Sequence, residues 1–181
     1  MMNSLMSNLE RNLIDNILES EIKLGCAGTT ITFYYPATSL VELLDCDMDG
    51  LDSAIAEFLE NEKNRLGGVD FEKLDDEKER YAVRIPLEGI YWVHANFQPS
   101  DFMKDFVKEI KRPENTLERV AELFYEYSPD VDIDKVNVDV WAIYFRDEAI
   151  DPYVYYIEQS IFGLEYHRFT RASYRMMTQG S

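Results

Sequence analysis

The strongest limit on the fold of this chain comes from its last third. Residues 140–145, VWAIYF, are apolar on both faces of a strand, which is typical of a strand buried on both sides. Residues 153–158 and 164–169 are also rich in aromatic and β-branched residues. Together with residues 138–145, they predict an antiparallel β-meander in which the apolar run is the central strand.

Helical periodicity prevails in the first two-thirds of the chain. Leu5, Leu9, Leu13 and Ile17 recur every four residues, which predicts a long amphipathic helix that ends at Gly25. Because helices come first and strands last, the pattern predicts an α+β fold, with several amphipathic helices packed against the C-terminal meander. The other expected elements are helices from Ser39, Leu51, Ser100, Asn115 or Thr116 and Thr170, a strand at 30–35, a hairpin of 69–71 with 81–85, and segment 90–95, which suits either strand or helix.

The length and composition fit one packed domain. The chain has 181 residues, of which 46% are hydrophobic and 13% aromatic, too many for a disordered chain. No repeat, low-complexity tract or linker divides it. We therefore expect a single globular domain over residues 1–181.

The cysteines and the N-terminus bear on the cell compartment. Cys26 and Cys46 are too few for a disulfide framework and form no C-x-x-C pair, so we expect two reduced thiols. Residues 1–5 lack the basic and apolar regions of a secretory signal. The apolar runs are also far shorter than the ~20 residues that span a bilayer. These features predict a cytoplasmic protein that is not embedded in a membrane.

The charge balance excludes some partners and favours others. The chain has 35 acidic and 18 basic residues, a net charge of −17. Such a surface repels nucleic acid phosphates and anionic lipid, so we expect no direct binding to either. It is complementary to a basic protein, so the leading functional hypothesis is a non-enzymatic, acidic binding or interaction protein with a basic protein partner.

The motifs that would indicate catalysis or metal binding are absent or incomplete. Residues 45–50, DCDMDG, match four positions of an EF-hand loop, but Asp52 and Ala56 occupy positions that need an apolar residue and a bidentate Glu. The chain contains no G-x-S-x-G, no phosphate-binding Gly-rich loop and no H-E-x-x-H. We therefore expect no bound metal and no cofactor. The question of enzymatic activity stays open, with the balance against it.

A second functional hypothesis concerns the end of the chain, where the net charge is zero over residues 151–181. Glu165 and His167 share one face of the last strand, and Arg168 leaves the opposite face. With Arg171, these residues are the candidate ligand-binding site of a small-molecule-binding protein or hydrolytic enzyme with a pocket near that strand. The alternative is that the arginines pair with acidic side chains of the same chain. The second histidine, His94, carries no local motif.

Four short segments resemble one known family. Residues 10–14 (ERNLI), 22–25 (IKLG), 34–36 (YYP) and 166–170 (YHRFT) are similar to an uncharacterised family of small acidic proteins from Gram-positive bacteria of the Clostridia type, classed as a domain of unknown function. The resemblance implies a bacterial cytoplasmic protein. It assigns no activity and no functional residue.

Overall fold

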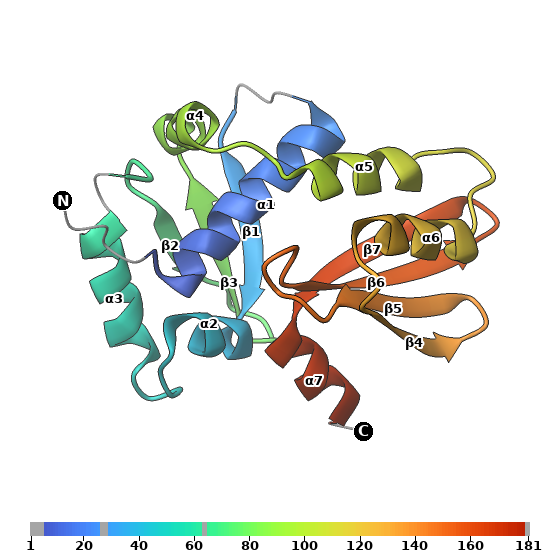
Figure 1. Ribbon diagram of the computed structural model, residues 1–181. Coiled ribbons are helices and arrows are strands. Elements are labelled where there is room, and N and C mark those ends of the chain that lie inside the picture. The colour runs from blue at the N-terminus through green and yellow to red at the C-terminus, as the bar shows by residue number, and fades with distance from the viewer. Residues whose placement is uncertain (1–5, 26–28, 63–64, 180–181) are drawn as a thin grey trace. The chain divides into compact units, whose positions relative to one another are not determined.

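The computed structural model describes residues 6–25, 29–62 and 65–179 (Figure 1). These residues form seven α-helices and two antiparallel sheets, so the fold is α+β, as predicted. Backbone contacts divide the chain into two compact units, Met1–Pro99 and Ser100–Ser181, called here the N-terminal and C-terminal units. The expectation of one domain over residues 1–181 stays a prediction.

The N-terminal unit combines four helices with a small sheet. The helix predicted first is present, and its side-chain cap is Ser7, whose hydroxyl accepts a hydrogen bond of 3.1 Å from the amide of Glu10. Leu5, the first apolar position of that predicted helix, lies outside the described residues. The elements are α1 (Asn8–Leu24), β1 (Ile31–Pro36), α2 (Ala37–Leu44), α3 (Leu51–Glu62), β2 (Asp70–Lys73), β3 (Arg80–Ile85) and α4 (Leu87–Asn96).

The sheet of this unit has the order β1-β3-β2, with all strands antiparallel. The register pairs Phe33 with Val83 and Phe71 with Val83, so these side chains share the face that is buried. Helix α1 lies across this sheet (Figure 1). The helices and strands share one apolar core, to which the four helices contribute Leu9, Leu13, Ile17, Leu40, Leu43, Leu51, Ile55, Phe58, Ile90 and Val93.

The start of α4 is held unusually close to the preceding chain. A Cβ atom at Gly89 would lie 2.3 Å from the carbonyl oxygen of Leu66 and 2.9 Å from its carbonyl carbon. Leu66 is fully buried in the core. Only a residue without a side chain allows this approach, so Gly89 is required for α4 to pack where it does.

The C-terminal unit contains the predicted meander, in the order β4-β5-β6-β7. Residues 140–145 form an interior strand, as predicted, and all but Tyr144 are buried. The elements are α5 (Asp101–Ile110), α6 (Leu117–Tyr127), β4 (Val131–Asn137), β5 (Val140–Phe145), β6 (Tyr153–Ser160), β7 (Gly163–Thr170) and α7 (Arg171–Gln179).

Aromatic rings hold α5 and α6 against one face of this sheet. The ring of Phe106 lies 4.5 Å from that of Tyr155 and 4.8 Å from that of Tyr166, measured between centroids. Phe102 contacts Phe124 and Phe145 at 4.9 Å each. These distances are those of offset and edge-to-face pairs, which add to the gain from burial. On the opposite face, Tyr174 of α7 packs against Ala142 and Val154.

One element departs from the sequence-based expectation, and another decides between two alternatives that the sequence left open. Strand β4 is absent from the sequence-based expectation, because its sequence, VDIDKVN, is largely polar and it lies at an edge of the sheet with its first three residues only half-buried and the other four exposed. Residues 90–95, which suited either strand or helix, belong to α4, where Ile90 and Val93 are buried at helical spacing. Among the described residues, no helix has the length and apolar character needed to cross a membrane.

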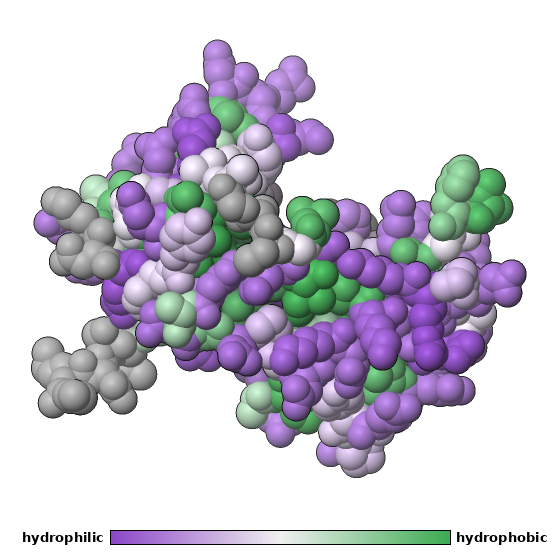
Figure 2. All heavy atoms as spheres, turned by 90° about the horizontal axis from the view of Figure 1, so that it is seen from above, coloured by the Kyte–Doolittle hydropathy of each residue, from purple (hydrophilic) through white to green (hydrophobic). Residues whose placement is uncertain are grey.

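The surface is mainly polar. Figure 2 shows one face on which hydrophilic residues prevail and hydrophobic side chains form separate patches. This distribution agrees with the large excess of acidic residues.

Candidate functional site

The structure places Glu165 and His167 on one face of β7, both exposed. Glu165 pairs across the ladder with Glu158, and His167 pairs with Tyr156. Arg168 points to the other face, as the alternation of a strand requires. Three of the four predicted site residues therefore divide between the two faces of the sheet.

Arg168 lies beside a buried tyrosine–aspartate pair. Its guanidinium is 4.4 Å from the ring centroid of Tyr153. Tyr155 donates a hydrogen bond of 2.7 Å to Asp151, and the amide of Tyr153 donates one of 2.9 Å to the same carboxylate. Burial, and then the Asp151 carboxylate, raises the pKa of Tyr155 well above its usual value, while Arg168 acts in the opposite direction. This cluster lies within the C-terminal unit and connects β6 and β7.

Arg171 also has partners in its own unit. It donates hydrogen bonds to the carbonyl oxygens of Phe145 and Pro152, and its Nε lies 3.3 Å from a carboxylate oxygen of Glu148. The guanidinium is 5.0 Å from the ring centroid of Tyr144. These contacts attach the start of α7 to the sheet. The hypothesis that Glu165, His167, Arg168 and Arg171 bind a ligand stays a prediction.

The incomplete EF-hand segment forms a turn ahead of α3. The carboxylate of Asp47 accepts a hydrogen bond of 2.7 Å from the amide of Gly50. In the described part of the chain, no group of three or more His, Cys, Asp or Glu side chains is arranged to hold a metal ion. Burial, followed by the carboxylates of Asp47 and Asp45, raises the pKa of the Cys46 thiol, which lowers its reactivity at neutral pH. Cys26 lies outside the described residues.

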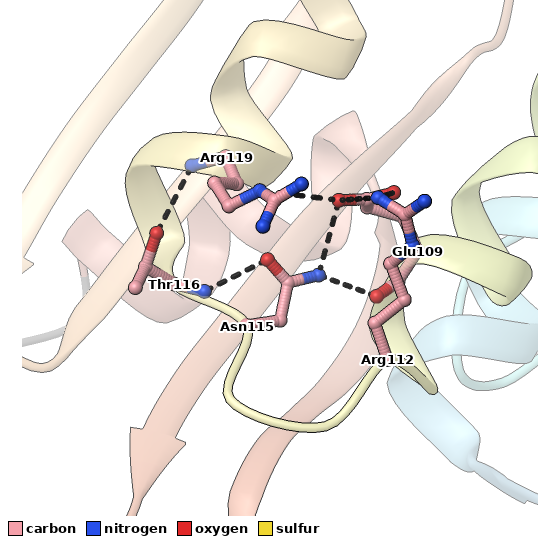
Figure 3. A network of polar contacts seen from close by, with 5 residues as sticks. All are labelled: Glu109, Arg112, Asn115, Thr116 and Arg119. Carbon is pink, nitrogen blue, oxygen red and sulfur yellow. Dashed lines mark hydrogen bonds and ion pairs between the residues drawn. The ribbon is translucent and has the colours of Figure 1, made fainter.

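A dense polar network at the corner between α5 and α6 is structural (Figure 3). Asn115 is buried, and its side-chain amide donates hydrogen bonds to the backbone carbonyl and the carboxylate of Glu109. Its side-chain oxygen accepts a hydrogen bond of 2.8 Å from the amide of Thr116. Arg112 and Arg119 lie 3.2 and 4.0 Å from the Glu109 carboxylate. Thr116, one of the two predicted starts of this helix, caps α6. The network fixes the turn between two helices and leaves Glu109 paired.

A pocket of about 270 Å³ lies in the N-terminal unit, between the end of α1, the start of β1, and α4. Its walls are mostly apolar, with hydroxyl groups and one acid–imidazole pair. The apolar part is formed by Ile17, Leu24, Ile31 and Ile90, and the polar part by Ser20, Glu21, Thr29, Thr30, Thr32 and His94.

Glu21 and His94 contact each other in the wall of this pocket. A carboxylate oxygen of Glu21 lies 3.4 Å from Nε2 of His94, and their side chains are 33% and 20% exposed. Glu21 is near the C-terminal end of α1, and His94 is in the last turn of α4. The C-terminal end of a helix carries a partial charge of about −0.5, so both helix ends add to the charge of Glu21.

This pair has no local signal in the sequence. Neither His94 nor Glu21 belongs to a motif, because the two residues meet only when α1 packs against α4. An amphipathic helix with a carboxylate at the edge of its apolar face is too common a pattern to indicate a site.

The fold and this pocket together define the class of the protein, an acidic α+β protein with a small pocket that holds a carboxylate–imidazole pair. The model of the family described as "Domain of unknown function, E. rectale Gene description (DUF3877)" matches residues 6–178, so the chain belongs to this family. The match confirms the resemblance to an uncharacterised family of Clostridia. No curated protein and no solved structure matches the chain.

Proposed function

We propose that the protein is a binding protein for a small ligand that has an apolar body and a cationic amine. The observation that carries the proposal is the Glu21–His94 pair, at 3.4 Å, inside an otherwise mostly apolar pocket. Ligand sites combine apolar walls with a few polar groups that orient the ligand, and this pocket has that composition.

The electrostatics of the pocket support a cation as the ligand. Glu21 and the two helix C-termini contribute negative charge, and the N-terminal unit carries 19 acidic against 8 basic residues, a net charge of −11. The amine would donate a charge-assisted hydrogen bond to Glu21, and His94 would hold that carboxylate in position. We place this binding in the bacterial cytoplasm, which the free thiol of Cys46 supports.

The size of the pocket limits the ligand. Its volume of about 270 Å³ is slightly below the range of roughly 300–1,000 Å³ that accommodates drug-sized molecules. A compact branched aliphatic amine fits this space, and its carbon chain would contact Ile17, Ile31 and Ile90. Thr30, which precedes β1, also lines the pocket, and its hydroxyl group could accept a hydrogen bond from the amine.

Three probes with one carbon skeleton test the proposal: 3-methylbutylamine, 3-methylbutan-1-ol and 3-methylbutanoate, titrated by calorimetry. We expect the amine to bind at least about tenfold tighter than the other two, because one charge-assisted hydrogen bond contributes about 1.5–3 kcal/mol. Equal affinity for all three, or no binding of the amine, would contradict the proposal.

Two pairs of variants assign the effect to the pocket. Glu21→Gln and His94→Gln should each weaken amine binding, the first by about tenfold or more. The matched controls are Glu165→Gln and His167→Gln, which change the same residue types on the exposed face of β7. If the controls weaken binding and the pocket variants do not, the ligand site is at β7 instead.

A further inference from the structure

Three apolar side chains project into solvent at one end of the C-terminal sheet. Ile161 and Phe162, in the turn between β6 and β7, are 94% and 91% exposed, and Val138, in the turn between β4 and β5, is 89% exposed. The two turns lie at the same end of the meander, because the amide of Gln159 donates a hydrogen bond of 2.8 Å to the carbonyl of Asp139. We call these three residues the apolar tip.

The turn that carries Ile161 and Phe162 is tightly structured. Ser160 pairs with Gly163 across the ladder. The hydroxyl of Ser160 accepts a hydrogen bond of 3.1 Å from the amide of Phe162 and donates one of 3.4 Å to the carbonyl of Gly163. Gly163, with φ +113°, takes the strained position. Tight hairpin turns are usually built from Gly, Asn, Asp and Ser. The fold therefore does not require apolar residues at this place, and their exposure indicates an interaction.

Three exposed carboxylates lie within a few residues of the apolar tip along the chain, and we call them its acidic rim. Glu158 and Glu165 are directly opposite each other on β6 and β7, and both are exposed. Like charges in this position destabilise a pair of strands. Asp139, in the other turn, is also exposed. An apolar centre with a charged rim is the usual anatomy of a protein–protein interface.

We propose that the apolar tip and its acidic rim dock into a basic protein partner, whose apolar depression is lined at its edge by Lys or Arg. Charge complementarity selects this occupant. The carboxylates of Glu158 and Glu165 repel an anionic membrane, and they would face like charges in a second copy of this chain. The surface belongs to the C-terminal unit and does not depend on the pocket of the N-terminal unit.

The test is a displayed library of random peptides, selected for binding to the full chain. We expect the enriched peptides to combine Lys or Arg with aliphatic or aromatic residues, and to bind less tightly as salt rises. Each enriched peptide is then titrated against the double variant Ile161→Ser/Phe162→Ser. Its affinity should fall at least about tenfold, as for residues at the centre of an interface.

The matched control is Met176→Ser/Met177→Ser, which removes two half-exposed apolar side chains of α7. It should leave peptide affinity unchanged, and the thermal melts of both double variants should match the parent. Glu158→Gln/Glu165→Gln should reduce the salt dependence. No enrichment, or equal affinity for parent and tip variant, overturns the proposal. The proposal is also overturned if the parent, but not the Ile161→Ser/Phe162→Ser variant, sediments with phosphatidylglycerol vesicles, which would indicate a membrane. It is likewise overturned if only the parent forms a dimer in solution, which would indicate a second copy of the chain.

Discussion

The hydroxyl of Tyr35 donates a hydrogen bond of 2.5 Å to the side-chain oxygen of Asn12, inside the N-terminal unit. Asn16, one turn further along α1, donates a hydrogen bond of 2.8 Å to the same hydroxyl. Asn12 and Tyr35 are both buried. The contact attaches the middle of α1 to β1, so two of the segments that carry the family resemblance, residues 10–14 and 34–36, meet for a structural reason.

Replacing Tyr35 by Phe removes both hydrogen bonds and keeps the ring. Each net hydrogen bond contributes about 0.5–1.5 kcal/mol, so we expect the free energy of unfolding to fall by about 1–3 kcal/mol. For a chain of this size, each kcal/mol lowers the melting temperature by about 2–4 °C. Tyr34→Phe is the control, because Tyr34 is 60% exposed on the other face of β1. Equal melting temperatures for the two variants would show that the Tyr35 contact adds nothing.

Tyr155→Phe tests whether the cluster around Arg168 is structural. The substitution removes the buried 2.7 Å hydrogen bond to the Asp151 carboxylate. A bond to a charged group contributes about 1.5–3 kcal/mol, so the urea midpoint should fall by a corresponding amount without a change in slope. Tyr156→Phe, one residue further on the opposite face, should change it little. If the urea midpoint fell in the Tyr156→Phe variant and not in the Tyr155→Phe variant, the structural role of Tyr155 would be contradicted.

Gly89→Ala should destabilise the N-terminal unit. The new methyl group would overlap the main chain of Leu66, which cannot move aside as a flexible side chain can. Overpacking of this kind costs about 1–3 kcal/mol. At Gly50, the nearest atom to an added Cβ is a side-chain oxygen of Asp47 at 3.1 Å, so Gly50→Ala is the milder control. Thermal unfolding of both variants measures the difference.

Tyr127 should make stability fall at alkaline pH. Burial, and then its hydrogen bond to Asp105, raises the pKa of Tyr127 to about 12. The unfolded chain releases the same proton near pH 10. The contribution of Tyr127 to the free energy of unfolding is therefore fully present below about pH 10 and is lost as the pH rises to about 12.

The measurement is the melting temperature from pH 9 to 12 for the parent, Tyr127→Phe and the exposed control Tyr125→Phe. Other tyrosines with a raised pKa remain in all three proteins, so the difference between curves isolates Tyr127. We expect the Tyr127→Phe curve to be the flatter one. Parallel curves for parent and Tyr127→Phe would contradict the assigned pKa.

The sequence predicted the elements whose apolar residues follow a clear period. Leu9, Leu13 and Ile17 indicated α1, and the apolar run at 140–145 indicated an interior strand, because burial on one or both sides leaves a direct trace in the residue types. Strand β4 left no such trace, since an edge strand gains its backbone pairing without burying most of its side chains. The pairing of β1 with β3 also has no local signal.

The candidate site was less accessible to prediction than the fold. Glu21 and His94 belong to helices that are far apart in the sequence, and only tertiary packing brings them to 3.4 Å. The candidate site near the last strand rests on residues that are close together in the chain. Neighbours on a strand point to opposite faces, so adjacency there separates Arg168 from His167.

The order of strands in the two sheets has a consequence for how the chain folds. In β4-β5-β6-β7, every strand pairs with its neighbour in the sequence, so each pairing closes a short loop. In the order β1-β3-β2, strand β1 pairs with β3, and the chain between these two strands contains α2, α3 and β2. Loop closure costs more entropy, and is slower, for the longer separation. During refolding, amide protons of β5 and β6 should therefore gain protection from exchange before those of β1, and the C-terminal sheet should form ahead of the N-terminal one.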